Sequence, residues 1–143
     1  MKVFTIGYTQ KSAEEFFTLL KHPDIVRIVD VRLNNVSQLA GFTKKNNLEY
    51  FLKEICDKEY IHRLDLAPTK DMLDEYKENH DWSHYVTVFT ELLRQRDISN
   101  TFPEELIDGS CFLCAEPTPE NCHRRLVVEC LQRKWSGLDI VHL

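Results

Sequence analysis

The sequence predicts an α/β fold: a single domain with a mainly parallel central sheet flanked by helices. Strand-like and helix-like segments alternate along the 143 residues, an order typical of parallel sheets built from strand–helix–strand units. The second strand-like segment, residues 24–33, is apolar almost throughout, as expected for a strand that is covered on both faces. The length is that of one ordinary domain, so we expect residues 1–143 to form one unit.

The first half of the chain begins with a strand, a helix and a second strand. β-branched and aromatic residues predict the first strand over residues 2–8. A helix is expected over residues 9–22, because Ser12 or Thr9 can cap its first turn and Glu15, three residues after Ser12, lies at the position of a capping box. The second strand then leads into a polar, irregular loop that runs from Leu33 to Asn47.

The second half adds further strands and helices. Apolar residues at helical spacing mark the helices, and short apolar or β-branched runs mark the strands. In chain order we expect a helix over 47–58, a short strand within 59–70, helices over 70–80 and 82–96, a strand over 109–117, a helix over 119–135 and a last strand over 138–143.

Composition excludes several classes of protein. The net charge of −5 argues against sequence-independent binding to long DNA, which requires clustered Lys and Arg. Four glycines leave no dinucleotide-binding or P-loop motif. Without a signal-peptide pattern or a long apolar run, the protein is expected to be cytoplasmic and to bind no membrane. Cys111 and Cys114 form C-x-x-C inside a strand, where they point to opposite faces, which excludes a thioredoxin-like motif.

Several chemically versatile residues stand where the predicted strands end, which is where open parallel sheets bind ligands. Asp30 interrupts an apolar strand, and a buried carboxylate needs a partner. Arg32 leaves the same face of the strand, so the two can form a structural ion pair or contact a ligand together. The candidate ligand-binding residues at the strand ends are Gly7, Tyr8, Asp30, Arg32 and Cys114.

The segment CAEPTPENCHRR is the most unusual part of the sequence. Its two prolines prevent a helix before about residue 120, and Thr118 or Asn121 is expected to cap that helix. Cys122–Arg125 then forms the first turn, where basic side chains meet the positive end of the helix. Such a conflict is tolerated when an anion lies close by. Arg124 and Arg125 are therefore candidate ligands for a phosphate, a carboxylate or an oxyanion, the alternative being an acidic group of the protein itself.

The same segment supplies the candidate catalytic residues. Glu116 is the best candidate general acid or base, and His123 can move protons or simply bond to Asp30 or Glu116. Cys122, at a helix start beside His and Arg, is a candidate nucleophile with a lowered pKa; an unreactive thiol is the alternative. Cys114, Cys122 and His123 could also bind zinc, but the paired short spacings of common zinc sites are missing, so no metal is predicted.

The segments TIGYT, SAEEFFTLL, VDVR, CAEPTPENCHRRLV and DIVHL, in this order, resemble the domain-of-unknown-function family 488. The resemblance spans nearly the whole chain and implies a compact α/β fold, but it implies no activity. Many relatives follow DVR with a basic loop rich in Ser and Pro, whereas this chain has LNNVSQLAGFTKKN. The residues that match the family motif are Gly7, Asp30, Arg32, Cys114, Glu116, Cys122, His123, Arg124 and Arg125. VDVR is also similar to a rhodanese strand, but the two prolines of CAEPTPENC argue against rhodanese chemistry.

These observations predict a class of ligand. The leading hypothesis is an enzyme that acts on a phosphate-bearing small molecule or nucleotide, with Arg32 and the two arginines of CHRR holding the anion and Glu116 or His123 moving protons. One alternative is a non-catalytic module that binds a nucleotide or a nucleic-acid end. Another is a thiol-dependent enzyme that uses Cys122 or Cys114. A small anionic ligand is the expected partner, nucleic acid is possible but not favoured, no cofactor is expected, and the oligomeric state stays open.

Overall fold

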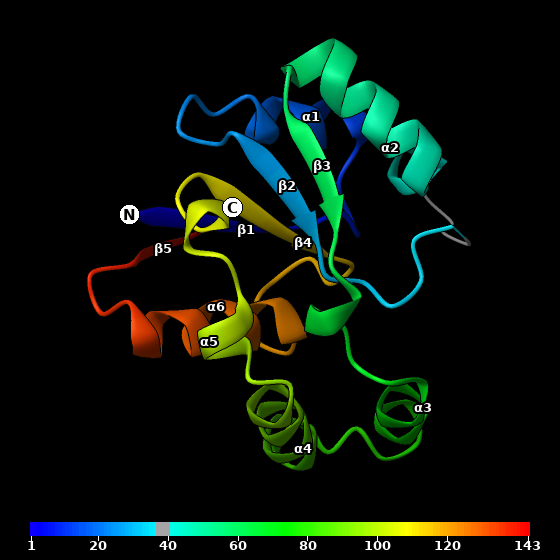
Figure 1. Cartoon of the computed structure of the whole chain (residues 1–143). Helices are drawn as coiled ribbons and strands as arrows, with labels where there is room; N and C mark the ends of the chain where they lie inside the picture. Colours follow the sequence, from blue (N-terminus) through cyan, green and yellow to red (C-terminus); the bar gives the residue numbers. More distant parts are fainter. Residues whose placement is uncertain (37–40) are drawn as a thin grey trace.

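The computed structural model describes residues 1–36 and 41–143, and its core is a five-stranded parallel sheet between two layers of helices (Figure 1). The strand order is β3-β2-β4-β1-β5, and every neighbouring pair is parallel. The predicted α/β class with one mainly parallel sheet is therefore confirmed. The strands are β1 (Lys2–Gly7), β2 (Arg27–Asp30), β3 (Glu59–His62), β4 (Ser110–Cys114) and β5 (Asp139–His142).

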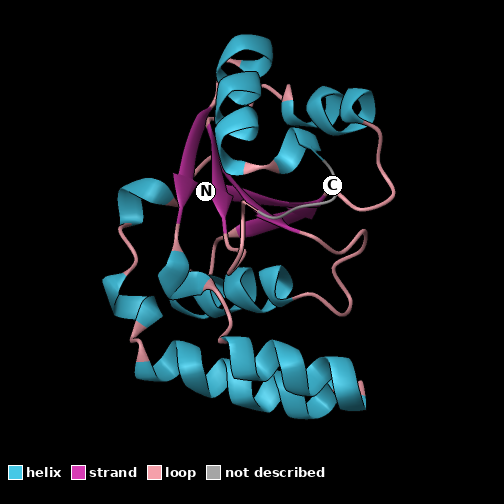
Figure 2. Ribbon diagram, turned by 90° about the vertical axis from the view of Figure 1, so that its right-hand side faces the viewer, coloured by secondary structure: helices cyan, strands magenta, loops and turns pink. Residues whose placement is uncertain are grey.

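The helices largely follow the sequence pattern, and Figure 2 shows them on both sides of the sheet. The first helix is capped as predicted, since the backbone N–H of Glu15 donates to Oγ of Ser12 at 3.1 Å. The helix predicted over 47–58 begins two residues earlier and changes into a π-helical turn, Leu52–Cys56. The helices are α1 (Ala13–Leu20), α2 (Lys45–Phe51), α3 (Lys70–Asn79), α4 (Trp82–Gln95), α5 (Ile98–Thr101) and α6 (His123–Lys134).

Part of the predicted loop between Leu33 and Asn47 is structured. A 3₁₀ turn, Gly41–Thr43, precedes the start of α2 at Lys45. Residues 37–40 of this loop lie outside the described residues. Across the described chain, none of the helices combines the length and apolar character needed to cross a membrane.

Each face of the sheet has its own hydrophobic core. The first core packs Phe16 and Leu20 of α1 and Leu48 of α2 against the sheet. The second packs Phe89 of α4 and Val127 of α6 against the opposite face. Successive side chains of β4 alternate between the two, so that Cys111 lies in the first core and Cys114 in the second, as the spacing predicts. The sheet lies between two helix layers and is covered on both faces, which explains why its strands are mostly apolar.

The neighbouring strands β2 and β4 send the chain to opposite faces of the sheet. β2 is followed by α2, on the same face as α1, whereas β4 is followed by α6 on the other face. Adjacent parallel strands that diverge in this way leave a crevice beyond their carboxyl ends. Figure 1 shows the α3–α4 hairpin on the outer side of the α6 layer, and α4 packs into the same core as α6.

The start of α6 differs from the prediction. The helix begins at His123, its N-cap is Cys122, and the Cys122 side chain makes no capping hydrogen bond. The expectation that Thr118 or Asn121 caps the helix is therefore wrong. The reason is a turn in which the backbone N–H of Cys122 donates to the carbonyl of Pro119 at 3.3 Å. This turn uses the residues before Cys122, so the extended backbone conformation that an N-cap requires falls at Cys122 itself.

Candidate functional site

A pocket of about 340 Å³ lies beyond the carboxyl ends of β2 and β4. The two strand ends and the start of α6 supply one part of its lining, and the α3–α4 hairpin supplies the other. This volume is in the range of sites that bind small molecules. The lining consists of Arg32, Leu33, Asn34, Pro68, Leu73, Tyr76, Lys77, Trp82, Tyr85, Cys114, Ala115, Glu116, Asn121, Cys122 and His123.

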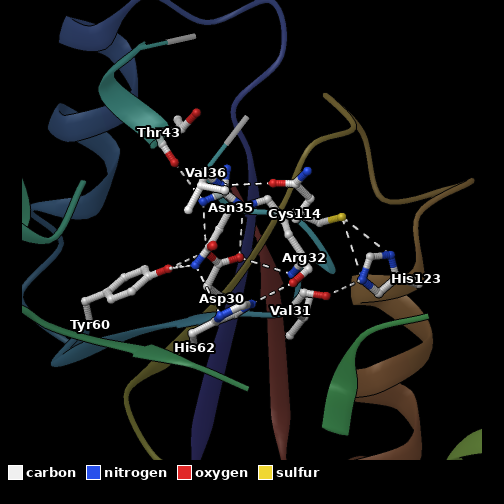
Figure 3. Close-up of polar contacts among 11 residues, drawn as sticks. Asp30, Val31, Arg32, Asn35, Val36, Thr43, Tyr60, His62, Cys114 and His123 are labelled. Carbon is white, nitrogen blue, oxygen red and sulfur yellow. Dashed lines mark hydrogen bonds and ion pairs between the residues drawn. The ribbon is translucent and has the colours of Figure 1, made fainter. Parts of the chain in front are cut away.

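A thiol and an imidazole meet at this pocket (Figure 3). Sγ of Cys114 lies 3.4 Å from Nδ1 of His123, and Nε2 of the same ring lies 2.8 Å from the carbonyl oxygen of Val31. A carbonyl only accepts hydrogen bonds, so Nε2 carries the proton and Nδ1 keeps its lone pair. The predicted bond from His123 to Asp30 or Glu116 is thus replaced by one to the backbone of the neighbouring strand. The Val31 carbonyl thus orients the imidazole, and the Cys114 sulfur lies beside the ring, 3.4 Å from Nδ1 and 3.8 Å from Nε2.

The two thiols at the pocket differ in their acidity. A hydrogen bond from Cys122, the strongest influence, lowers the pKa of the Cys114 thiol below its ordinary value despite burial. The pKa of Cys122 is raised well above its ordinary value by its hydrogen bond to Cys114 and by burial. The lowered pKa that the helix start predicted for Cys122 is therefore wrong in direction. Of the pair, Cys114 is the thiol that ionises first, because Cys122 keeps its proton and donates it.

Asp30 and Arg32 form a buried bidentate ion pair, as the sequence suggested. Nε of Arg32 donates to Oδ1 of Asp30 at 2.9 Å, and Nη2 donates to Oδ2 at 2.8 Å. Burial lowers the pKa of Arg32, but the hydrogen bond and charge of Asp30 outweigh burial and raise it. Tyr60 donates a further hydrogen bond of 2.6 Å to Asp30. Arg32 is thus held rigidly at the edge of the pocket, and its Nη1 has no well-aligned hydrogen-bond acceptor among the described residues.

Gly7 and Arg124 hold the loop that follows β4. The Arg124 side chain is fully buried and donates to the carbonyl oxygen of Glu116 at 2.5 Å and to the hydroxyl of Thr5 at 3.3 Å. A Cβ atom on Gly7 would lie only 1.6 Å from the same Glu116 oxygen. Neither residue is in the described lining of the pocket. The structure therefore shows a structural contact with the loop for both residues, and their contact with a ligand stays a prediction.

The remaining candidates lie at different distances from the pocket. The Tyr8 ring lies 5.4 Å from the Arg32 guanidinium, on which it packs, and burial raises the pKa of Tyr8. Arg125 approaches Glu129 on the surface of α6 at 3.8 Å and, like Tyr8, is not among the described lining residues. Glu116 is exposed and belongs to the lining. The structure thus brings together Arg32, Cys114, Glu116, Cys122 and His123, and leaves the other predicted residues outside the lining.

Sequence reasoning missed the contribution of the α3–α4 hairpin. Tyr76, Lys77 and Trp82 border the pocket, and the Trp82 ring stacks on Tyr85 with centroids 5.1 Å apart. Helical spacing predicts that Trp82, Tyr85 and Phe89 belong to the core, with a dimer face as the alternative, and Tyr85 and Phe89 are buried. Trp82, at the start of α4, is only half-buried, so the aromatic face of this helix extends from the core to the pocket. Helical spacing shows which residues share a face, but not that the end of that face borders a pocket.

Comparison with known proteins identifies a family. The sequence model of the family described as "Domain of unknown function DUF488" matches residues 12–131. The matched region contains β2, β4, both helices of the hairpin and the start of α6, and so includes every lining residue of the pocket. No curated protein and no solved structure matches the chain.

Proposed function

Because the chain belongs to the DUF488 family, whose description names no activity, we propose from the pocket itself that the protein is an enzyme acting on a small phosphate-bearing molecule or nucleotide. The observation that carries the proposal is the composition of one pocket. It combines cationic groups, aromatic rings and a buried thiol–imidazole pair at the carboxyl ends of parallel strands. Pockets with a few convergent polar groups and perturbed pKa values are the usual sites of chemistry.

Two kinds of side chain support this class of ligand. Arg32 and Lys77 supply positive charge to the lining, and a planar guanidinium held by Asp30 is suited to bind phosphate oxygens. Tyr76 and Trp82 supply aromatic faces on which a nucleobase can stack. The anion is thus bound by Arg32 and Lys77, and Arg124 and Arg125 contribute through the structure of the loop and helix.

Glu116 is the general acid or base of this proposal. Its carboxyl is exposed, belongs to the lining and follows Cys114 by two residues. The Arg124 bond to its backbone carbonyl fixes the main chain at this position, so the side chain has a defined origin at the edge of the pocket. A positioned carboxylate of this kind contributes to catalysis by proton transfer with the bound ligand.

The binding step is tested by thermal-shift measurements with phosphate, mononucleotides, dinucleotides and ADP-ribose. A ligand present at about 100 times its dissociation constant stabilises the folded state by roughly 2.7 kcal/mol, which is several degrees for a domain of this size. The shift should be smaller in Lys77→Ala and unchanged in Lys70→Ala, since Lys70 is on the same helix but not in the described lining. A panel without any shift would contradict the proposal.

Catalysis is tested separately by chromatography of the stabilising ligand after long incubation. We expect the wild type to convert the ligand. Glu116→Gln should lose this conversion but keep the thermal shift. Recovery of the ligand unaltered would show a binding module instead of an enzyme. Short oligonucleotides belong in the same panel, because a shift with oligonucleotides alone would point to a nucleic-acid end as the ligand.

Thiol-dependent catalysis at Cys114 is a second candidate function, favoured by the 3.4 Å contact between Cys114 and His123. A nucleophile beside a base, with the base oriented by a third group, is the arrangement of thiol enzymes, and here the Val31 carbonyl orients the base. Brief treatment of chelator-treated protein with iodoacetamide, followed by peptide mapping, should label Cys114 before Cys111 or Cys130. Labelling of Cys114 last would exclude this function.

A further inference from the structure

Three side chains that bind transition metals meet at the pocket, and we propose that Cys114, Cys122 and His123 hold a zinc ion. One ligand atom from each residue, the two sulfurs and one ring nitrogen of His123, lies within 4.8 Å of the other two. Cys114 ends β4, Cys122 is the N-cap of α6 and His123 is the first residue of that helix. The three come from two rigid elements of the core, so their side chains are placed together by the fold and not by a flexible loop.

The spacing of the ligand atoms fits a tetrahedral zinc site. Zinc bonds of about 2.3 Å to sulfur and about 2.0–2.1 Å to nitrogen separate two such ligands by roughly 3.6 Å at a tetrahedral angle. Sγ of Cys114 and Nδ1 of His123 are 3.4 Å apart. The same sulfur lies 3.8 Å from Nε2, so it sits beside the ring, and a rotation of the Cys114 or His123 side chain is needed to bring an ion onto the Nδ1 lone pair and the sulfur together. The 4.8 Å limit keeps Sγ of Cys122 near the same ion.

The hydrogen bond of His123 selects the nitrogen that a metal needs. Its Nε2 donates to the Val31 carbonyl at 2.8 Å, which leaves the lone pair of Nδ1 for coordination (Figure 3). Histidines that bind metals almost always donate their other ring N–H to a carbonyl or carboxylate, which fixes the orientation of the ring. In this respect His123 is already oriented as a metal ligand.

The chemistry of the donors favours zinc over other ions. Two thiolates and an imidazole suit zinc, whereas magnesium and calcium require oxygen ligands. Two thiolate charges also balance the double charge of the ion. That balance matters here because Cys114, Cys122 and His123 are only 7 %, 2 % and 6 % exposed, and a net charge at such a depth would be costly.

The fourth position of this ion would face the pocket. All three ligands belong to the pocket lining, together with Glu116 and Asn121. Three protein ligands with one open position are typical of catalytic zinc, whereas structural zinc has four. The metal would thus present a water molecule or a ligand oxygen to the pocket, a role that rests on the proposed function. Metal binding and a free Cys114 nucleophile require the same sulfur atom and are alternatives.

The first test measures metal content in the full-length protein. The protein is stripped with a chelator, incubated with zinc chloride, desalted and analysed by mass spectrometry of the metal. One equivalent of zinc is expected in the wild type and in the control Cys130→Ser, whose thiol lies on α6 outside the site. Cys114→Ser, Cys122→Ser and His123→Gln should each fall to background. Little zinc in the wild type, or equal zinc in all the variants, overturns the inference.

Cobalt spectroscopy tests the site without a variant that might unfold. Cobalt(II) added to the stripped wild type should give thiolate-to-cobalt charge-transfer bands and the intense visible bands of a tetrahedral ion, and zinc should remove both. A spectrum of aqueous cobalt overturns the inference. Both metal measurements are made without nucleotide, so they can fail independently of the thermal-shift panel. If nucleotides stabilise the protein but zinc does not bind, the proposed function stands and the metal site is overturned.

Discussion

Nη1 of Arg124 donates a hydrogen bond of 2.5 Å to the backbone carbonyl of Glu116, eight residues earlier in the chain. The contact lies directly over the end of β1, where Gly7 leaves room for it. The loop between β4 and α6 is therefore fastened to the sheet by a residue of the helix that it precedes. Because Cys114 and His123 lie at the two ends of this loop, the fastening also sets the distance between them.

Gly7→Ala should destabilise the protein, because the added Cβ would lie 1.6 Å from the Glu116 oxygen and 2.8 Å from the Arg124 guanidinium. Overpacking of this kind costs about 1–3 kcal/mol, and each kcal/mol lowers the melting temperature by roughly 2–4 °C in a domain of this size. The control is Gly137→Ala, where the same atom meets nothing within 4 Å. Equal melting temperatures of the two variants would contradict the close approach.

Adjacent arginines of α6 should respond very differently to substitution. Arg124→Met removes a buried donor from the Glu116 carbonyl and from Thr5, and a hydrogen bond from a charged group contributes about 1.5–3 kcal/mol. Arg125→Met changes only a partly exposed side chain with a 3.8 Å contact to Glu129, and its effect should stay within about 0.5 kcal/mol. Urea unfolding measures both, and similar losses would show that the burial of Arg124 is unimportant.

Asp30→Asn should destabilise the protein by about 3–5 kcal/mol, because it leaves the buried Arg32 without a counter-charge. The chain contains a matched control. Arg63 and Asp65 form another bidentate pair two residues apart, but it is partly exposed. Asp65→Asn should therefore cost about 1 kcal/mol or less. Chemical unfolding of both variants under the same conditions gives their losses of stability. An equal loss would show that burial does not make the Asp30–Arg32 pair more important than the partly exposed one.

The alkylation of Cys114 should have a pH profile shifted to lower pH than that of an ordinary thiol. Its pKa is lowered from 9.0, mainly by the hydrogen bond from Cys122. The thiolate therefore persists at pH values where other thiols are protonated, and the rate falls as the pH drops through the lowered pKa. Cys122→Ala should move the midpoint upwards. Rates measured by mass spectrometry on zinc-free protein give both midpoints, and an unchanged midpoint in the variant would rule out the hydrogen bond as the cause.

Trp82 should report ligand binding through its fluorescence, because it borders the pocket whereas Trp135 ends α6. In Trp135→Phe, a nucleoside monophosphate that stacks on Trp82 should quench the emission in a saturable manner. In Trp82→Phe, the emission of Trp135 should not change. A response from Trp135 alone would place the ligand elsewhere on the molecule.

Local sequence rules predict the parts of the structure that depend on neighbours in the chain. Ser12 caps α1 as expected because the bond spans three residues. The pair between Asp30 and Arg32 follows from the cost of burying a carboxylate and from the two-residue period of a strand. Cys111 and Cys114 face opposite cores for the same geometric reason.

The site itself depends on contacts that these rules do not reach. His123 bonds to Val31, which is 92 residues away in sequence, and the partner is a backbone carbonyl that no side-chain pattern reveals. The guanidinium of Arg124 is a group that commonly binds anions, yet it donates its hydrogen bond to a backbone carbonyl as well. The wall formed by Tyr76 and Trp82 depends on how the hairpin packs on α6, which helical periodicity does not determine.

The two halves of the pocket have different origins in the chain. The two thiols and the imidazole of Cys114, Cys122 and His123 lie at the junction of β4 and α6, which is anchored in the core. The opposing wall comes from one uninterrupted stretch, residues 68–85. Under the proposed function, mutations in that stretch would change which molecule the pocket accommodates while the groups at the β4–α6 junction stay the same, so selectivity and chemistry would be free to diverge during evolution. For protein engineering, this stretch is a natural segment to exchange between members of the family.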